Sequence, residues 1–175
     1  MLTTKSENGN VTFRFHNQVL NRLRDESNQK RISLNTLASQ IFQSHVEYHI
    51  YAARAGMVSF PKSLLVRIMN GLSDQEVDAL SEHIAKNEIK DMTRLVKNEY
   101  SIPAFLDMFE SWLRISGFTY RRDAADSDQT FVIQHDMGRR WSTYLEKLIE
   151  FVFKDLNEEK PSFDVSDNTV SFRIK

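Results

Sequence analysis

Two histidines, His45 and His49, stand four residues apart in a segment with helical spacing of its apolar residues. An i, i+4 pair on a helix can bring two imidazoles to one metal ion. The chain has no cysteine, and its other histidines, at positions 16, 83 and 135, are scattered, so a metal site would need carboxylates or ligands from a second chain. We therefore expect no metal or other cofactor; His45 is better explained by packing between two chains, with His49 near the edge.

Two cations, Arg139 and Arg140, precede a long helical pattern, and a helix N-terminus also attracts anions. The favoured interpretation is that Asp136 caps this helix while the arginines are solvated. The 175 residues contain no glycine-rich phosphate loop and no recognisable motif around a nucleophile. The sequence therefore does not predict an enzyme.

The segment Val11–His16 alternates apolar and polar residues, which predicts a strand with one wet face. An isolated strand cannot bury three large side chains, and no second strand follows within hairpin distance. We therefore expect a second copy of the chain to supply the partner strand, an arrangement that suggests a DNA-binding dimer. The apolar face consists of Val11, Phe13 and Phe15, and the polar face consists of Asn10, Thr12 and Arg14.

Two helical patterns follow this strand. Asn17 is a good N-cap for a first helix that runs to about residue 28, and Ser33 is a good N-cap for a second. The second helix continues to about Arg54, and Gly56 is a natural stop. The apolar stripe of the first helix is Val19, Leu20 and Leu23, and that of the second is Leu34, Leu37, Ala38, Ile41, Phe42 and Val46.

Residues 10–48 resemble a ribbon-helix-helix domain, the family of small dimeric transcription factors that read operators with a β-ribbon. The resemblance covers roughly a quarter of the chain and rests on the strand, the two leucines of the first helix, the Ile32-Ser33 step and the second stripe. The family's strand often ends in proline where this chain has His16. Its loop usually has glycine at the position of Arg31, so Arg31 is expected to adopt the loop conformation at some cost in strain.

The resemblance implies that two antiparallel strands, one from each chain, lie in the major groove. Arg14 has the strongest case for base contact, because a guanidinium can bond guanine O6 and N7 bidentately. Backbone N–H groups at the start of the second helix, and two cations just before it, would hold a phosphate. The implied base-contacting residues are Asn10, Thr12 and Arg14, and the implied phosphate-contacting residues are Lys30, Arg31, Ser33, Leu34 and Asn35.

The charge distribution agrees with this interpretation. Residues 1–56 have seven Lys and Arg against four Asp and Glu, and residues 57–175 have sixteen against twenty. A basic N-terminal domain on an acidic remainder fits a local DNA footprint. No apolar run approaches the length of a membrane span or signal segment, so we expect a cytoplasmic protein without membrane partners.

Residues 57–175 read as a second domain, giving an α+β chain overall. Helices are expected from Pro61, from the capping box at Ser73–Glu76, over 88–98, and from Pro103 to before Gly117. Strands over 118–121, 130–134, 163–165 and 169–174, around a helix over 139–156, predict a ββαββ antiparallel sheet with helices on one face. Seven aromatic residues are better explained as core than as the lining of an effector pocket: Phe105, Phe109, Trp112, Phe118, Tyr120, Trp141 and Tyr144.

The sequence therefore predicts a homodimeric transcriptional regulator. Its domain over 1–56 would bind DNA, and its domain over 57–175 would extend dimerisation or sense an unidentified small-molecule effector. The alternative is an antitoxin-like or adaptor protein whose C-terminal domain binds a protein partner. Antitoxins with this N-terminal domain usually have short, poorly folded tails, whereas residues 100–175 have the pattern of a folded domain.

Overall fold

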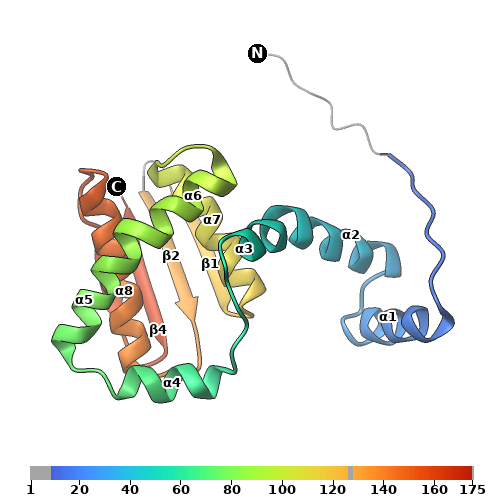
Figure 1. Ribbon diagram of the computed structural model, residues 1–175, viewed down its shortest axis with the longest axis horizontal. Coiled ribbons are helices and arrows are strands. Elements are labelled where there is room, and N and C mark those ends of the chain that lie inside the picture. The colour runs from blue at the N-terminus through green and yellow to red at the C-terminus, as the bar shows by residue number, and fades with distance from the viewer. Residues whose placement is uncertain (1–8, 126–127, 175) are drawn as a thin grey trace, which may run out of the picture. The chain divides into compact units, whose positions relative to one another are not determined.

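Figure 1 shows the computed structural model of the chain, which describes residues 9–125 and 128–174. The chain divides into two compact units, which we call the N-terminal unit (Met1–Gln43) and the C-terminal unit (Ser44–Lys175). This division lies ahead of the boundary after residue 56 that the sequence indicates. The described residues form helices and an antiparallel sheet, so the predicted α+β class is confirmed.

The N-terminal unit contains α1 (Asn17–Gln29) and most of α2 (Leu34–Ser44). Residues 9–16 form neither helix nor strand, so the strand expected over Val11–His16 is absent from this single chain, and the order here is helices first and strands later. A strand needs a hydrogen-bonded neighbour, and among the described residues no other segment pairs with this one. An N-terminal ribbon-helix-helix arrangement is therefore not formed within one copy.

The sequence predicts N-caps at Asn17, Ser33 and Ser73. The predictions for Ser33 and Ser73 are confirmed, because each side chain accepts a hydrogen bond from the backbone N–H three residues later. The prediction that Asn17 is an N-cap is wrong, because Asn17 is already the first residue of α1. His16 holds the N-cap position with an extended backbone, and its carbonyl accepts hydrogen bonds from the N–H groups of Val19 and Leu20.

The helices of the C-terminal unit are, in chain order, η1 (His45–His49), α3 (Ile50–Arg54), α4 (Lys62–Asn70), α5 (Asp74–Ile84), η2 (Ala85–Ile89), α6 (Lys90–Lys97), α7 (Ile102–Ile115) and α8 (Arg139–Asp155). The two helices expected through Ile84 and over 88–98 are joined, since α5, η2 and α6 follow without a break. No glycine or proline between residues 74 and 97 ends the helix, and the π-helical turn η2 widens it locally instead. The helix ends at Asn98, whose φ is 60°.

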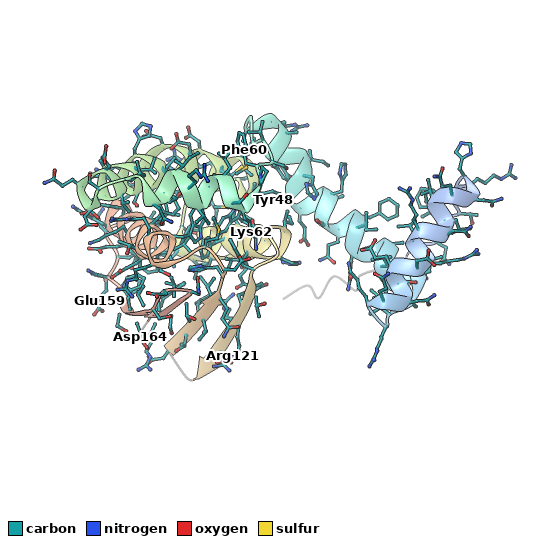
Figure 2. All side chains as sticks on the ribbon, turned by 90° about the horizontal axis from the view of Figure 1, so that it is seen from below. Tyr48, Phe60, Lys62, Arg121, Glu159 and Asp164 are labelled. Atoms are coloured by element: carbon teal, nitrogen blue, oxygen red, sulfur yellow. The ribbon has the colours of Figure 1, made fainter. Side chains whose placement is uncertain are left out.

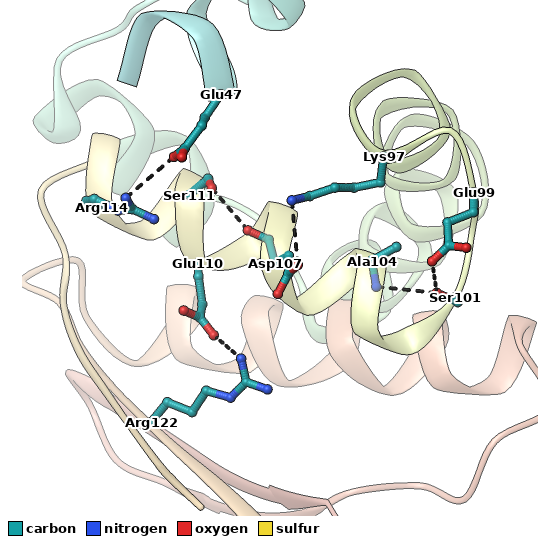
Figure 3. Close-up of polar contacts among 10 residues, drawn as sticks. All are labelled: Glu47, Lys97, Glu99, Ser101, Ala104, Asp107, Glu110, Ser111, Arg114 and Arg122. Atoms are coloured by element: carbon teal, nitrogen blue, oxygen red, sulfur yellow. Dashed lines mark hydrogen bonds and ion pairs between the residues drawn. The ribbon is translucent and has the colours of Figure 1, made fainter. Parts of the chain in front are cut away.

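Helix α7 is tied to its neighbours by polar contacts (Figure 3). Its N-cap is Ser101, whose Oγ accepts a hydrogen bond from the Ala104 N–H at 3.3 Å, and Pro103 occupies the first turn as expected. Its ion pairs are Arg114 with Glu47 (3.6 Å), Asp107 with Lys97 (3.6 Å) and Glu110 with Arg122 (2.7 Å). These pairs join the helix to η1, to α6 and to the first strand of the sheet, β1 (Thr119–Ala125).

The sheet of the described chain has the strand order β1-β2-β4-β3, antiparallel throughout. The predicted order of two strands, a helix and two strands is confirmed. The central strands β2 and β4 align buried pairs on the inner face, Phe131 opposite Phe172 and Ile133 opposite Val170. The strands are β1 (Thr119–Ala125), β2 (Asp128–Gln134), β3 (Ser162–Val165) and β4 (Thr169–Ile174).

The helices of the C-terminal unit cover one face of this sheet (Figures 1 and 2). Helices α7 and α8 lie against the strands, while α5 packs on α8 and α6 packs on α7. The opposite face is open and carries exposed polar side chains such as Arg121 and Asp164 (Figure 2). None of the helices in the described ranges combines the length and apolar character needed to cross a bilayer.

Candidate nucleic-acid interface

The N-terminal unit leaves most of its large apolar side chains in solvent. Among its described residues only Ser27 and Leu37 are buried. The ring of Phe13 stacks on that of Phe42 with centroids 5.2 Å apart, yet both remain about half exposed. A unit with so little buried apolar surface cannot be stable by itself. The exposed apolar residues are Val11, Phe13, Phe15, Val19, Ile41 and Phe42.

The three residues with an implied role in base contact, Asn10, Thr12 and Arg14, are all exposed. They alternate with the exposed apolar residues of the same segment. Arg14 makes no ion pair with any residue in the described ranges, so its guanidinium has all its donors available. Within one chain no strand of the described residues pairs with this segment, so no sheet aligns these side chains on one face.

The turn between α1 and α2 is a Schellman motif. The Arg31 N–H donates to the Asn28 carbonyl at 3.1 Å, and the Ile32 N–H donates to the Ser27 carbonyl at 3.0 Å. Arg31 has a φ of 54°, the left-handed conformation that glycine adopts with least strain. The loop conformation expected at Arg31 is thus present.

We expect Arg31→Gly to raise the free energy of unfolding by about 1 kcal/mol, because it removes the left-handed strain at φ 54°. Urea denaturation of the full chain, followed by circular dichroism, measures the change. Asn98→Gly, at φ 60°, is the matched control and should gain less, because asparagine tolerates this conformation. If the stability of Arg31→Gly is unchanged or lower, the claim that the backbone is strained at Arg31 is wrong.

The start of α2 combines a cap with free backbone donors. Ser33 Oγ accepts a hydrogen bond from the Thr36 N–H at 3.0 Å, and the first amides of the helix, at Leu34 and Asn35, have no partner within the helix. Lys30 lies in the turn before α2, and its Nζ is 2.6 Å from Glu26 Oε1. Ser33, Asn35, Lys30 and Arg31 are exposed and Leu34 is half-buried, so the implied phosphate contacts lie around one turn and one helix start.

The expected arrangement at the start of α8 is wrong. Gly138, not Asp136, holds the N-cap position, and the Asp136 carboxylate is bonded to Lys62 Nζ at 2.8 Å. The hydrogen bond from Lys62 holds the pKa of Asp136 below its usual value. Neither arginine is simply solvated, because Arg139 donates to the Val165 carbonyl and Arg140 pairs with Asp74. Both arginines thus bond to other parts of the C-terminal unit at its surface.

The seven aromatic residues belong to the core of the C-terminal unit. Phe105, Phe109 and Phe118 are buried in it, and the others are buried or packed against it. The favoured interpretation of these residues as core is therefore confirmed. Burial raises the pKa of the Tyr144 phenol far above its usual value.

A buried polar network centres on His135, which sequence reasoning gave no role. Its Nδ1 accepts a hydrogen bond from the Met137 N–H at 3.3 Å, so the proton of the neutral ring is on Nε2, which lies 2.9 Å from Ser142 Oγ. The Ser142 hydroxyl donates to the Asp167 carbonyl at 3.1 Å, and Ser142 is fully buried. The network joins the end of β2, the start of α8 and the β3–β4 turn. The signal was present in the alternation of Phe131, Ile133, His135 and Met137.

Burial lowers the pKa of His135 below its usual value of 6.5; the charge of the nearby Asp136 opposes this shift, and that of Lys62 adds to it. The unfolded chain therefore takes up this proton first as the pH falls below about 6.5, and the free energy of unfolding should decrease there until the folded ring also protonates. His135→Gln should lack this component of the pH dependence. His83→Gln, at an exposed site, should keep it. Denaturant titrations across this pH range test it, and equal slopes for wild type and His135→Gln would contradict it.

The histidine pair in η1 does not form a cluster with further ligands. The ring centroids of His45 and His49 are 6.4 Å apart, and both side chains are exposed. Over residues 9–125 and 128–174, no group of three or more His, Asp or Glu side chains gathers as a metal site would require. Comparison of this chain with protein-family models, with curated proteins and with solved structures finds no match.

Proposed function

We propose that the chain is a sequence-specific DNA-binding transcriptional regulator that acts as a homodimer. Residues 10–15 of two copies pair as an antiparallel ribbon-helix-helix β-ribbon and enter the major groove, where Asn10, Thr12 and Arg14 contact base edges. The start of α2, with Lys30 and Arg31 before it, holds the phosphate backbone.

The observation that carries this proposal is the exposure of alternating apolar residues in the N-terminal unit. Val11 is 72% exposed, Phe13 50% and Phe15 46%, although all three have the pattern of one buried strand face. Pairing with a second copy satisfies both the strand backbone and the apolar side chains. The same pairing turns the alternate polar residues together toward the opposite face.

Charge supports the same conclusion. The residues that would contact DNA include the cations Arg14, Lys30 and Arg31. Residues 1–56 have a surplus of three positive charges, whereas residues 57–175 have a surplus of four negative charges. A dimer doubles the positive charge near the ribbon. Phosphate repels the acidic C-terminal unit, so DNA binding is assigned to the N-terminal unit.

The proposal is tested by selecting duplexes from a random pool with the full chain. Binding of the selected duplexes is then titrated at several salt concentrations. We expect one enriched, pseudo-palindromic sequence. Lys30→Ala should weaken binding to every duplex about equally and reduce the salt dependence, because one phosphate contact is lost per copy. Glu26→Gln should have the opposite effect, because Glu26 now holds Lys30 at 2.6 Å.

Two outcomes would contradict the proposal. One is the absence of any enriched duplex at low salt. The other is binding that Lys30→Ala and Glu26→Gln leave unchanged while a substitution in the C-terminal unit, such as Arg121→Ala, removes it.

A further inference from the structure

The loop before α4 and the outer face of α4 expose a run of large apolar side chains within the C-terminal unit. We call Met57, Val58, Phe60, Leu64 and Ile68 the α4 patch. Their exposed fractions are 48%, 70%, 56%, 41% and 52%. An ordinary protein surface has exposed apolar side chains that are scattered singly, whereas here five of them occur within twelve positions.

The α4 patch is held in place by the fold. Helix α4 has apolar residues on two sides: Leu65, Val66 and Met69 pack against the core, while Leu64 and Ile68, four residues apart, face outward. The loop is anchored at Met57, whose N–H donates to the Ala52 carbonyl at 2.9 Å and whose Sδ lies 3.3 Å from Tyr48 Oη. The patch therefore needs no folding step before it can bind a partner.

The charged residues of the segment that contains the patch, from Tyr48 to Ser73, are all basic: Arg54, Lys62 and Arg67. No aspartate or glutamate occurs from Tyr48 to Ser73, although acidic residues are in excess in the rest of the C-terminal unit. Lys62 is already bonded to Asp136. Arg54 and Arg67 are exposed, and neither forms an ion pair with any residue in the described part of the chain. Exposed apolar surface beside unpaired cations is complementary to a ligand that is both apolar and acidic.

We propose that the α4 patch binds an acidic amphipathic segment of a partner protein. The apolar face of that segment would cover Phe60, Leu64 and Ile68, and its carboxylates would pair with Arg67 and Arg54. A second copy of this chain fits less well, because an isologous contact places the same patch on itself and brings like charges together. A lipid surface also fits less well, since recognition of anionic lipid uses a larger cluster of cations than two free arginines.

This proposal is independent of the DNA-binding function and can be tested separately. The probe is a fluorescently labelled synthetic peptide that forms an amphipathic helix with leucine on one face and glutamate elsewhere. We expect saturable binding to the full chain, measured by anisotropy. Ile68→Asp should weaken binding roughly tenfold or more, since it places a carboxylate in the apolar contact. Arg67→Glu should also weaken it, and this effect should shrink at high salt.

Leu95→Asp, at an exposed apolar residue of α6 outside the patch, is the matched control and should bind like wild type. A peptide with lysine in place of glutamate should not bind. Two peptide results would overturn the proposal: no binding of the acidic peptide to wild type, or equal binding by Ile68→Asp and wild type. Binding to phosphatidylserine vesicles through Ile68 and Arg67, without binding to the peptide, would indicate a lipid surface instead. A change in sedimenting mass in Ile68→Asp alone would indicate a second copy of the chain instead. DNA binding by Ile68→Asp should be unaffected, which separates this test from that of the proposed function.

Discussion

Phe13→Asp should leave the protein monomeric, with an N-terminal unit that does not fold. In one copy the Phe13 ring is half exposed and stacks on Phe42 at 5.2 Å. In the proposed dimer this ring is buried, so a carboxylate there costs on the order of 4 kcal/mol per copy. Because unpaired copies bury little else in this unit, the helical signal of α1 and α2 should fall together with the dimer. Sedimentation equilibrium and circular dichroism measure the two effects.

Gln40→Asp is the matched control, because it adds the same charge at an exposed polar position of α2. This variant should sediment as a dimer. A folded, stable monomer of the wild-type chain at micromolar concentration would refute the dimer, as would a dimeric Phe13→Asp.

Arg14→Ala should weaken binding to the selected duplex and relax its sequence preference. Each bidentate contact to guanine contributes about 1–3 kcal/mol of discrimination, and the loss occurs in both copies. The selected duplex should therefore lose one or more orders of magnitude in affinity, while binding to unrelated duplexes changes little. Fluorescence anisotropy with matched and mismatched duplexes measures both quantities.

Arg24→Ala controls for the loss of a charge, because Arg24 is an exposed residue of α1 away from the alternating segment. It should change affinity for all duplexes by a similar factor and leave the preference intact. If Arg14→Ala behaves like Arg24→Ala, the assignment of Arg14 to base contact is wrong.

The C-terminal unit was predictable because its signals are local. The capping box at Ser73 and Glu76, the proline in the first turn of α7 and the alternation around Phe131 and Phe172 each depend on neighbouring residues or on period-2 patterning. These signals gave the order of strands and the helix between them. The joining of α5 to α6 was missed, because a π-helical turn shifts the apolar stripe without a glycine or proline to mark it.

Other features depend on parts of the molecule that are distant in sequence or belong to another copy. Ser142 bridges His135 and the Asp167 carbonyl only when the β3–β4 turn is folded against the start of α8. Asp136 was assigned as a cap from its spacing, but its partner Lys62 lies 74 positions earlier. The segment Val11–His16 has the pattern of a strand and no partner among the described residues, so its conformation is not determined by one chain.

The strand order has a consequence for how the C-terminal unit is synthesised. Strand β4, the last of the sheet to leave the ribosome, is a central strand, and it joins β2 to β3. Until β4 emerges, the nascent chain exposes one open edge of β2 and leaves β3 with no neighbour. Closure of the sheet must therefore wait for the final strand, while the helices that precede it can already form. Chaperones that shield unpaired strand edges during translation should consequently matter more for this unit than for a sheet in which each strand pairs with the one before it.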